Sequence, residues 1–546
     1  MAQVWKKISS TVHKSIKDIE NTLYQNRGLA TEDAKKFFQN PSHPADISLK
    51  DLNIDKKDLK IVLERINKAK RDKESIVIYT DYDVDGILGG TILWEGLYEY
   101  GLKVMPYVPE RKKEGYGLGK IGIDNIKKAY NPSLIITIDN GISAQSQIQY
   151  AKDCGIETIV LDHHTKGNII DAKIVHTTKI CATSIAWYVI NNLTKIKKPE
   201  SAANLDLCAL ATVSDCMPLQ GVGRSLVVHG LDELRKTKRI GLNALIKQAG
   251  IKKEKIGVFD IGFILGPRIN AMGRIAHALD SLRLMCTKDI DRAEKLAFLL
   301  NQTNKSRQQA SEIALKEAID QYKNSANNEK IIAISGQYNP GIIGLVAGKL
   351  AEIFYKPAIV ISETGPLAKA SMRSIPGVNI TEMVRSIDNL LENVGGHPMA
   401  GGFTVEKNKI PSLIKRLYQI AESTIDPNLL IKSLSIDCPL IFDLIGKDLL
   451  TVVSKLSPYG IGNPEPVFAT ERVTIINAKK VGSYGQHLKV QFANKNDIID
   501  GIGFGLGDRF KQLKKNMDIA YSLEENHWNG KTSLQLNIKD VNIPNE

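Results

Sequence analysis

Three short apolar segments of this chain each end in acidic or histidine residues. Residues 76–80 (IVIYT) lead into DYDVDG, residues 134–138 (LIITI) lead into DNG, and residues 158–161 (TIVL) lead into DHH. Short β-branched segments bounded by Asp and Gly are typical of buried parallel strands. Ligand sites of open α/β sheets lie beyond the carboxyl ends of the strands. We therefore expect these carboxylates and imidazoles to meet at one edge of a parallel sheet.

The residue types at this edge favour one kind of metal. Oxygen ligands with one or two histidines suit Mn²⁺ or Mg²⁺ better than a zinc site built on thiolates. Each motif also has a simpler structural explanation, since DYDVDG could cap a helix, DNG could be a turn and DHH could be a surface loop. Asp215 is a fourth candidate, because it ends the apolar, helix-like segment 207–214. The occurrence of all four in one chain favours a metal site that hydrolyses phosphoesters.

Composition limits the class of protein. A chain of 546 residues exceeds what one hydrophobic core usually serves, so several domains are expected. No apolar segment approaches the roughly 20 residues of a membrane helix, and the first residues lack the apolar core of a signal peptide. The six cysteines have no paired spacing, which argues against a disulfide framework or a zinc ribbon. We expect a cytoplasmic protein without membrane contact.

The formal net charge of +13 fits a polyanionic partner such as nucleic acid. Solvated lysine faces explain many basic proteins equally well, so charge alone does not decide between these alternatives.

Changes in the pattern of apolar, polar and turn-forming residues divide the sequence into five segments. Residues 1–54 are expected to form a polar helical arm with a helix start at Thr31, and residues 55–280 alternate strands and helices as βαβ units do. Residues 281–329 contain neither Gly nor Pro, which predicts a long bridging helix with an apolar stripe of Ile290, Ala293, Leu296, Leu299 and Leu300. Residues 330–428 are expected to form a second α/β lobe. Residues 429–546 are expected to form a small β-barrel with a hairpin turn at Asn529-Gly530.

The motifs occur in an order that resembles a known family. DYDVDG, IDNG, LDHH and ATVSDCMPL resemble the DHH phosphoesterase superfamily, and GFILGPRINAMGR, NPGIIGLVAGKLAE, ASMRS, GGHPMAGG and PYGIGNPEPVF resemble signatures of the RecJ family of single-strand-specific exonucleases. The resemblance covers nearly the whole chain. It implies an α/β fold class with a parallel-sheet DHH catalytic domain, a long bridging helix, a second α/β DHH-associated domain and a C-terminal OB-type β-barrel.

The resemblance also implies a site with two divalent cations, Mn²⁺ or Mg²⁺. One ion would be held by Asp83 and Asp139, and the other by Asp85, Asp139, His163 and Asp215, with Asp139 as the bridge. Three further residues are expected to take part in catalysis, His164 at the scissile phosphate, Asp162 as the group that orients its neighbours, and Asp81 beside the ligands.

A second group of residues is expected to contact substrate. Arg268, Asn270 and Arg274 lie in a segment too polar for a plain core, although a buried salt-bridge role is the alternative. The resemblance places a 5′-terminal phosphate near Arg111, Arg274, Ser371 and Arg373, and a backbone phosphate near His397. Tyr116 could stack on a base or serve in packing.

The chain departs from the family pattern at three places. Tyr79 stands where some superfamily members carry a metal-binding His, and Tyr338-Asn339 and Val222-Gly223 replace the usual Trp-His and Glu-Asn. These changes concern local packing or substrate contacts, because the metal set is intact.

The function implied by the resemblance is that of a monomeric 5′→3′ exonuclease on single-stranded DNA. It would release mononucleotides by two-metal hydrolysis in recombination and repair, with a helicase and a single-strand-binding protein as partners. One alternative is a DHH-type phosphoesterase for oligonucleotides or dinucleotides, which would lack the bridging helix and barrel. Another is a non-catalytic replication scaffold, which would lack the ligand carboxylates that are present here at Asp83, Asp85, Asp139 and Asp215.

Overall fold

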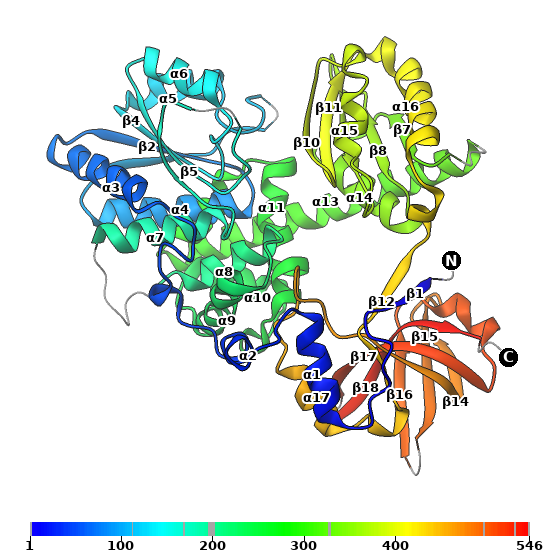
Figure 1. Cartoon of the computed structure of the whole chain (residues 1–546). Helices are drawn as coiled ribbons and strands as arrows, with labels where there is room; N and C mark the ends of the chain where they lie inside the picture. Colours follow the sequence, from blue (N-terminus) through cyan, green and yellow to red (C-terminus); the bar gives the residue numbers. More distant parts are fainter. Residues whose placement is uncertain are drawn as a thin grey trace. The chain divides into compact units, whose positions relative to one another are not determined.

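The computed structural model describes residues 3–111, 113–167, 170–194, 203–325, 329–494, 497–528 and 531–543. The chain divides into two compact units, one of residues 31–305 and 456–464 and the other of residues 1–30, 306–455 and 465–546 (Figure 1). In the described residues no helix is both long enough and apolar enough to cross a membrane.

The unit of residues 31–305 is built on a parallel sheet, as predicted, and its five strands lie in the order β3-β2-β4-β5-β6. The strands are β2 (Ser75–Thr80), β3 (Lys103–Tyr107), β4 (Leu134–Ile138), β5 (Glu157–Asp162) and β6 (Lys173–His176). The chain first adds β3 on one side of β2 and then β4 on the other. Ligands of such sheets bind at this point of reversal, and it is here that DYDVDG and DNG follow their strands.

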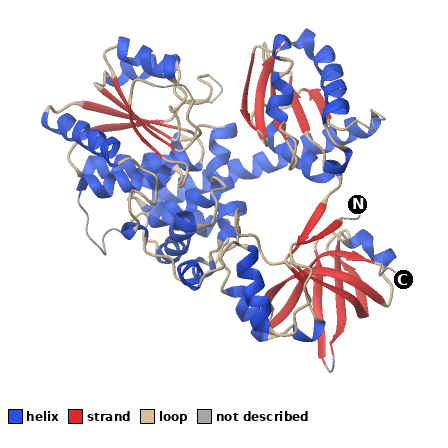
Figure 2. Ribbon diagram, in the orientation of Figure 1, coloured by secondary structure: helices blue, strands red, loops and turns tan. Residues whose placement is uncertain are grey.

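Side chains alternate between the two faces of this sheet, as strand geometry requires. Ile76 and Ile78 of β2 point into one core cluster, and Val77 and Tyr79 point into another. Helices cover both faces (Figure 2). The first cluster is completed by α3 (Lys56–Arg71), α4 (Val84–Glu99), α7 (Ala182–Thr194) and α8 (Leu205–Ser214), and the second by α5 (Lys120–Tyr130) and α6 (Gln145–Asp153).

The same unit holds a further group of helices. They are α2 (Glu32–Gln39), α9 (Gly221–Lys236), α10 (Ile240–Ala249), the π-helix η4 (Asp260–Leu265), α11 (Gly266–Ile275) and α12 (Leu279–Cys286). The predicted helix start at Thr31 is confirmed, because the Thr31 side chain accepts a hydrogen bond from the backbone N–H of Ala34 at 3.2 Å.

The long helix α13 spans Ile290–Asn324, so it begins later than the predicted 281. The Thr287 hydroxyl accepts from the Asp289 N–H at 3.2 Å, and Asp289 accepts from the Arg292 N–H at 2.8 Å. These short-range bonds end α12 and start α13 without Gly or Pro. The predicted apolar stripe is partly wrong, because Ile290 is 65% and Leu299 40% exposed, whereas Ala293, Ala297 and Leu300 are buried.

The second α/β lobe contains a mixed sheet in the order β10-β11-β9-β8-β7, in which only β7 and β8 are parallel. Its strands are β7 (Ile332–Gly336), β8 (Ala358–Ser362), β9 (Ala368–Arg373), β10 (Asn393–His397) and β11 (Ala400–Val405). Its helices are α14 (Ile343–Phe354), α15 (Ile380–Arg385) and α16 (Ile410–Thr424).

The C-terminal strands close into a barrel. Their order is β14-β15-β16-β18-β17, and β17 pairs back with β14. The strands are β14 (Phe468–Val481), β15 (His487–Asn494), β16 (Asp497–Gly503), β17 (Asn516–Trp528) and β18 (Lys531–Asn542), with β13 (Cys438–Pro439) beside β14 and α17 (Lys447–Ser454) before it. β17 and β18 are antiparallel neighbours, and the turn predicted at Asn529-Gly530 lies outside the described residues.

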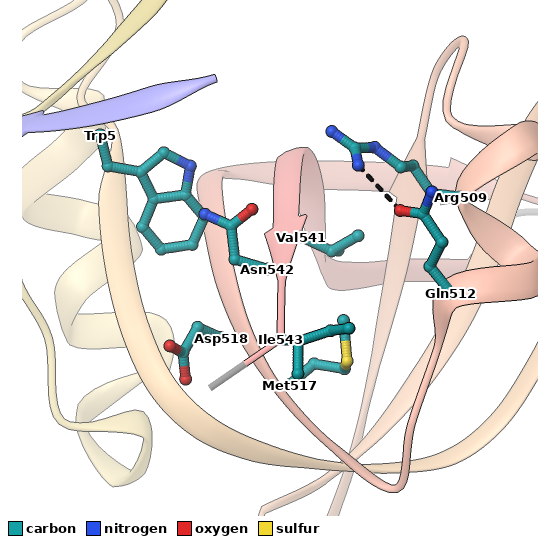
Figure 3. A pocket seen from close by; sticks show the side chains of 8 residues that line it. All are labelled: Trp5, Arg509, Gln512, Met517, Asp518, Val541, Asn542 and Ile543. Atoms are coloured by element: carbon teal, nitrogen blue, oxygen red, sulfur yellow. Dashed lines mark hydrogen bonds between the residues drawn. The ribbon is translucent and has the colours of Figure 1, made fainter. Parts of the chain in front are cut away.

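A cavity of about 430 Å³ lies beside the start of β17 and the end of β18 (Figure 3). Trp5 forms one wall and donates through its indole N–H to the buried Asp540 at 3.0 Å, and Arg509 contacts the same carboxylate at 3.3 Å. The N-terminal segment therefore packs against the barrel and lines this cavity.

This placement corrects the prediction that residues 1–54 form a helical arm. Residues Val4–Lys7 form strand β1, which pairs in parallel with β12 (Ser433–Ile436), because the exposed edge of β12 supplies backbone partners. After it, α1 (Ile16–Asn26) is held by a buried ion pair of Arg27 with Asp437 at 3.1 Å.

Candidate metal centre

The loop after β2 brings two carboxylates together. Asp83 is the N-cap of α4 and accepts from the Gly86 N–H at 3.2 Å. A Cβ at Gly86 would lie 2.6 Å from the Asp81 carbonyl oxygen, so only glycine fits. The tight turn lets Asp81 and Asp83 converge although they are two residues apart.

The loop after β4 adds Asp139, whose backbone φ of +63° is unusual for a residue with a side chain. Such strained conformations cluster at functional sites. Asn140 fixes this loop, because its side-chain amide donates to the carbonyl oxygens of Ile138 at 2.9 Å and Tyr79 at 3.4 Å. Asp81, Asp83 and Asp139 each place a carboxylate oxygen within 4.8 Å of the others.

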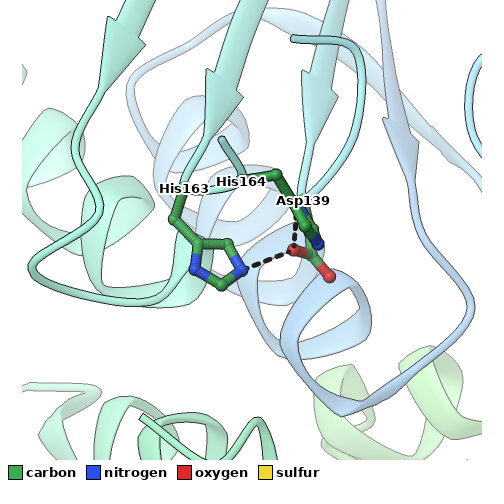
Figure 4. A group of neighbouring side chains, drawn as sticks. All are labelled: Asp139, His163 and His164. Carbon is green, nitrogen blue, oxygen red and sulfur yellow. Dashed lines mark ion pairs between the residues drawn. The ribbon is translucent and has the colours of Figure 1, made fainter. Parts of the chain in front are cut away.

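The loop after β5 directs His163 at this edge. Its Nε2 lies 3.2 Å from Asp139 (Figure 4), 3.3 Å from Asp215 and 3.6 Å from Asp85. Burial lowers the pKa of His163, so a neutral imidazole faces three carboxylates. Two further ligand groups result, one of Asp139, His163 and His164 and one of Asp85, His163 and Asp215.

Asp162 organises the two histidines. One oxygen accepts from His164 Nδ1 at 2.7 Å and from the backbone N–H groups of His163 at 2.8 Å and His164 at 3.1 Å, and the other accepts from the Ile142 N–H at 3.0 Å. The hydrogen bond with Asp162 raises the pKa of His164 to about 9. His164 is one-third exposed and therefore offers a cation to an anionic group.

Asp85 has a structural task that the sequence did not reveal. Its two oxygens accept from the backbone N–H groups of Ala182 at 2.7 Å and Thr183 at 2.8 Å, at the start of α7. A carboxylate at a helix N-terminus is stabilised by the free N–H groups there. Asp85 thus anchors α7 at the site, and its part as a metal ligand stays a prediction.

The carboxylates of the cluster are buried close to one another, so bound cations would stabilise their charged forms. Burial and the neighbouring carboxylates raise the pKa of Asp81, Asp83 and Asp139, and the same causes raise that of Asp215 to about 9. Asp139 Oδ1 and His163 Nε2 lie 3.2 Å apart, but among the described residues neither of these buried atoms makes a hydrogen bond of acceptable geometry. Buried polar atoms rarely remain unpaired. Because carboxylates with one or two imidazoles suit Mn²⁺ or Mg²⁺, the residues fit a divalent metal centre.

Three predicted substrate residues border this centre. The Arg111 guanidinium lies 5.1 Å from the centre of the Tyr82 ring, and the charges of Arg111 and Arg274 both act on Tyr82. Tyr116 is 61% exposed and meets Tyr82 edge to face at 6.1 Å. These residues lie around the DYDVDG loop, and their contact with substrate stays a prediction.

Arg268 and Asn270 are engaged in the fold. Arg268 donates to Asn301 at 3.1 Å and to the Ile264 carbonyl at 2.7 Å, and Asn270 accepts from the Val84 N–H at 3.0 Å. These bonds give both residues a role in holding α11 in place. Contact with substrate stays a prediction for them as well.

The remaining substrate residues lie in the second α/β lobe. Ser371 and Arg373 share one face of β9, and Arg373 donates to the Ser371 hydroxyl at 3.2 Å. Ala400 of β11 pairs with both Arg373 and His397, so the three residues form one cross-strand row. His397 is exposed.

Residues at which the chain departs from the family pattern make packing contacts or hydrogen bonds within the fold. Tyr79 is buried against Tyr107, and its hydroxyl donates to the Gly117 carbonyl at 3.1 Å. Tyr338 donates to Gln321 at 3.2 Å. A Cβ at Gly223 would lie 2.2 Å from the Pro218 carbonyl oxygen, so no side chain fits there.

Known proteins share this arrangement. Three family models match the chain, those of the DHH family N-terminal domain over residues 75–212, the DHHA1 domain over residues 327–423 and the RecJ OB domain over residues 436–540. The single-stranded-DNA-specific exonuclease RecJ of Bacillus subtilis is 32% identical over 554 residues, which cover 98% of this chain and 69% of the relative. The chain belongs to the RecJ family.

Solved RecJ structures have the same fold. The crystal structure of RecJ from Thermus thermophilus in complex with Mn²⁺ matches with a TM-score of 0.84 and 26% identity, covering 100% of this chain and 80% of that chain. The Mg²⁺ complex of the same protein matches with a TM-score of 0.78 and 25% identity, covering 100% and 79%. The expected fold class of DHH domain, DHH-associated domain and OB-type barrel is therefore confirmed.

Proposed function

We propose that this RecJ-family chain is a metal-dependent exonuclease that hydrolyses single-stranded DNA from the 5′ end and releases 5′-mononucleotides in DNA recombination and repair. The observation that carries the proposal is the convergence of Asp81, Asp83, Asp139, His163, His164 and Asp215 at the reversal point of the parallel sheet. The relatives are named as exonucleases specific for single-stranded DNA.

Two divalent cations, Mn²⁺ or Mg²⁺, belong to the proposal. Asp83 and Asp139 would hold one ion, and Asp85, Asp139, His163 and Asp215 would hold the other, with Asp81 beside them. When bound, such ions activate a water molecule and neutralise charge on the attacking and leaving oxygens. The two unpaired atoms, Asp139 Oδ1 and His163 Nε2, support this assignment.

The chain's own residues would place the substrate. His164, held by Asp162 and with its pKa raised to about 9, can donate a hydrogen bond to a phosphate oxygen. Arg111 and Arg274 beside Tyr82 would attract the phosphate at the 5′ end, and Arg268, Asn270 and Tyr116 would line the approach. In the second α/β lobe, Arg373 lies in one cross-strand row with His397 and donates to Ser371, an arrangement suited to a phosphate.

The domain assignment is part of the proposal. Residues 55–280 would carry catalysis, residues 281–329 would connect the lobes, and residues 330–428 and 429–546 would hold the strand. Residues 1–54 would have a structural role and pack against these domains.

A monomer in the cytoplasm, with a helicase and a single-strand-binding protein as partners, completes the proposal. The six cysteines are all free, which fits a reducing compartment.

The test is product analysis with end-labelled DNA and each metal. We expect mononucleotides from the 5′ end of single-stranded DNA in Mn²⁺ or Mg²⁺, little cleavage of blunt duplex, and none in a chelator. Efficient cleavage of dinucleotides only would favour the oligonucleotide phosphoesterase. Metal-independent DNA binding without any cleavage would favour the scaffold.

A further inference from the structure

Two phenylalanines in the segment before α11 are exposed and stacked on each other. The rings of Phe259 and Phe263 lie 4.9 Å apart at an angle of 26°. Phe259 is 65% and Phe263 72% exposed. Exposing two large apolar rings forgoes the free energy of burial, so an exposed apolar group of this kind often marks a binding surface.

The segment that carries them is anchored to the metal centre at two places. A Cβ at Gly266 would lie 2.5 Å from the Ser214 hydroxyl, next to Asp215, and a Cβ at Gly273 would lie 2.6 Å from the Tyr82 carbonyl oxygen, next to Asp81 and Asp83. The helix η4–α11 therefore runs between the two acidic loops. Phe263 lies three residues before Gly266, so the segment that carries the stacked pair leads directly into the helix that packs against the site.

The local helix geometry explains the exposure. Residues Asp260–Leu265 form a π-helix, and such turns are frequent at functional sites. Ile261 and Leu265 point into the core, whereas Phe263 between them faces solvent. The wider turn thus keeps the apolar residues buried and turns the two rings outward.

The segment that carries the pair has more cationic than acidic residues, which favours a polyanion over an apolar protein partner. Residues 252–275 carry five cationic residues, Lys252, Lys253, Lys255, Arg268 and Arg274, against two acidic ones, Glu254 and Asp260. A cationic surface with an exposed aromatic stack is how proteins hold single-stranded nucleic acid, because every base has a face that can stack.

We propose that Phe259 and Phe263 form a stacking platform for the bases of the single-stranded substrate at the approach to the metal centre. This inference rests on the proposed function. Only unpaired bases could stack on this platform, so it would favour single-stranded DNA. It would have little sequence preference, since any base can stack.

The test separates base stacking from phosphate attraction. Binding is measured in a chelator, to prevent hydrolysis, with an oligothymidylate and with an abasic oligomer of the same length and charge. We expect the unchanged protein to prefer the thymidylate and the variant Phe259→Ala/Phe263→Ala to lose this preference, with about tenfold weaker thymidylate binding and little change for the abasic strand.

Three variants sharpen the comparison. Phe298→Ala removes a 52% exposed phenylalanine of α13 and should leave the preference intact. Phe263→Trp should retain the preference because it can stack, and Phe263→Leu should lose most of it although it stays apolar. Because both rings are exposed, the melting temperature of the double variant should be unchanged.

Several results would overturn the inference. An unchanged preference in the double variant would mean that bases are held elsewhere. A loss of self-association in that variant would assign the surface to a second copy of the chain. If the unchanged protein cleaves single-stranded DNA but shows no preference for bases, only the platform fails. If it neither cleaves nor binds DNA, the proposed function fails with it.

Discussion

At the scale of single residues, Asp139 is the group on which the site depends most. It belongs to two of the three ligand groups, and its strained backbone is fixed by Asn140. Asp139→Asn keeps the shape and removes the charge. We expect hydrolysis to fall by more than about a thousandfold, and we expect the rise in melting temperature on addition of Mn²⁺ to shrink.

The metal-free variant should melt no lower than the unchanged protein, because crowding among carboxylates already raises the pKa of Asp139. Asp124→Asn is the matched control, since Asp124 is an exposed carboxylate of the same unit that only accepts from Tyr150 at 2.7 Å. Near-normal turnover and an unchanged Mn²⁺ shift in Asp139→Asn would refute the metal assignment.

Arg373 is expected to recognise the phosphate at the 5′ end. Its hydrogen bond with Ser371 aligns the two side chains on the exposed face of β9. A charge-assisted hydrogen bond contributes about 1.5–3 kcal/mol, so Arg373→Ala should reduce cleavage of a 5′-phosphorylated end by about ten- to a hundredfold more than that of a 5′-hydroxyl end. Lys369→Ala, on the same face of the same strand, should affect both ends equally and weakly.

The cleavage rates of 5′-phosphorylated and 5′-hydroxyl DNA distinguish the two possible roles of Arg373. An equal loss on both substrates would mean that Arg373 serves the fold. The structure offers such a role, because a Cβ at Gly344 would lie 3.0 Å from the Arg373 guanidinium.

At the scale of elements, the sequence predicted what depends on local pattern. The three strands that carry the motifs follow from β-branched segments bounded by Asp and Gly, and their meeting at one edge follows from parallel pairing. The bonds of Asp85 to α7 and of Asn270 to Val84 could not be predicted, because the partners lie 97 and 186 residues apart. The break before α13 was missed because Thr287 and Asp289 end and start helices without Gly or Pro.

A buried arginine ties the elements of the parallel sheet together. Arg65 of α3 donates to Glu157 at the start of β5 and, at 2.7 Å, to Glu74 before β2. Burial would raise the pKa of Glu157, but the hydrogen bond and charge of Arg65 lower it below its ordinary value of 4.5. A lowered pKa in the folded state stabilises the fold above the ordinary pKa, and this contribution disappears as the pH falls through the lowered value.

Glu157→Gln should therefore destabilise the protein at pH 7 by about 1 kcal/mol, a modest figure because the Glu157 side chain is 51% exposed. The difference in melting temperature from the unchanged protein should be roughly 2 °C at pH 7 and should shrink below about pH 4. Glu64→Gln on α3 is the control, since its pair with Lys60 is exposed and contributes little. A difference that does not change with pH would exclude the charge as its cause.

At the scale of the whole molecule, the units are not continuous in sequence. The first residues pair with β12 through β1 and contact the barrel through Trp5, and residues 456–464 belong to the unit of the parallel sheet. There the buried Arg224 donates to the carbonyl oxygens of Leu456 at 3.3 Å, Ser457 at 2.5 Å and Pro458 at 3.2 Å. An interpretation of the sequence segment by segment assigns the first residues and residues 456–464 to the wrong domains, because their contacts are with residues distant along the chain.

Because residues 456–464 belong to the unit of the parallel sheet, the role of the barrel cannot be tested by simple truncation. Truncation before residue 456 would remove the Leu456, Ser457 and Pro458 acceptors of the Arg224 guanidinium and leave it the Phe38 carbonyl at 2.7 Å. A buried cation that loses most of its partners costs several kcal/mol. The catalytic unit would then be damaged together with the loss of the barrel. Substitutions on the barrel surface avoid this difficulty.

Lys479 and Lys489 are the best positions for such substitutions. They lie directly opposite each other on β14 and β15, and the neighbouring Asn477 and Gln491 join at 3.2 Å beside them. Like charges at opposed positions of a sheet are destabilising by roughly 0.2–1 kcal/mol. A phosphate bound between the two lysines would offset this repulsion, which suggests that the pair follows the backbone of the DNA strand.

Lys479→Gln/Lys489→Gln should weaken binding of long single strands and lower the slope of log affinity against log salt by about 1.4, since each phosphate contact on a single strand contributes about 0.7. Cleavage of short oligonucleotides should be unchanged, whereas long strands should be released early. Lys539→Gln should leave the slope unaltered, because Glu465 already pairs with Lys539 at 3.3 Å. A double variant that melts higher but keeps the full salt slope and processivity would show that this face of the barrel does not hold the strand.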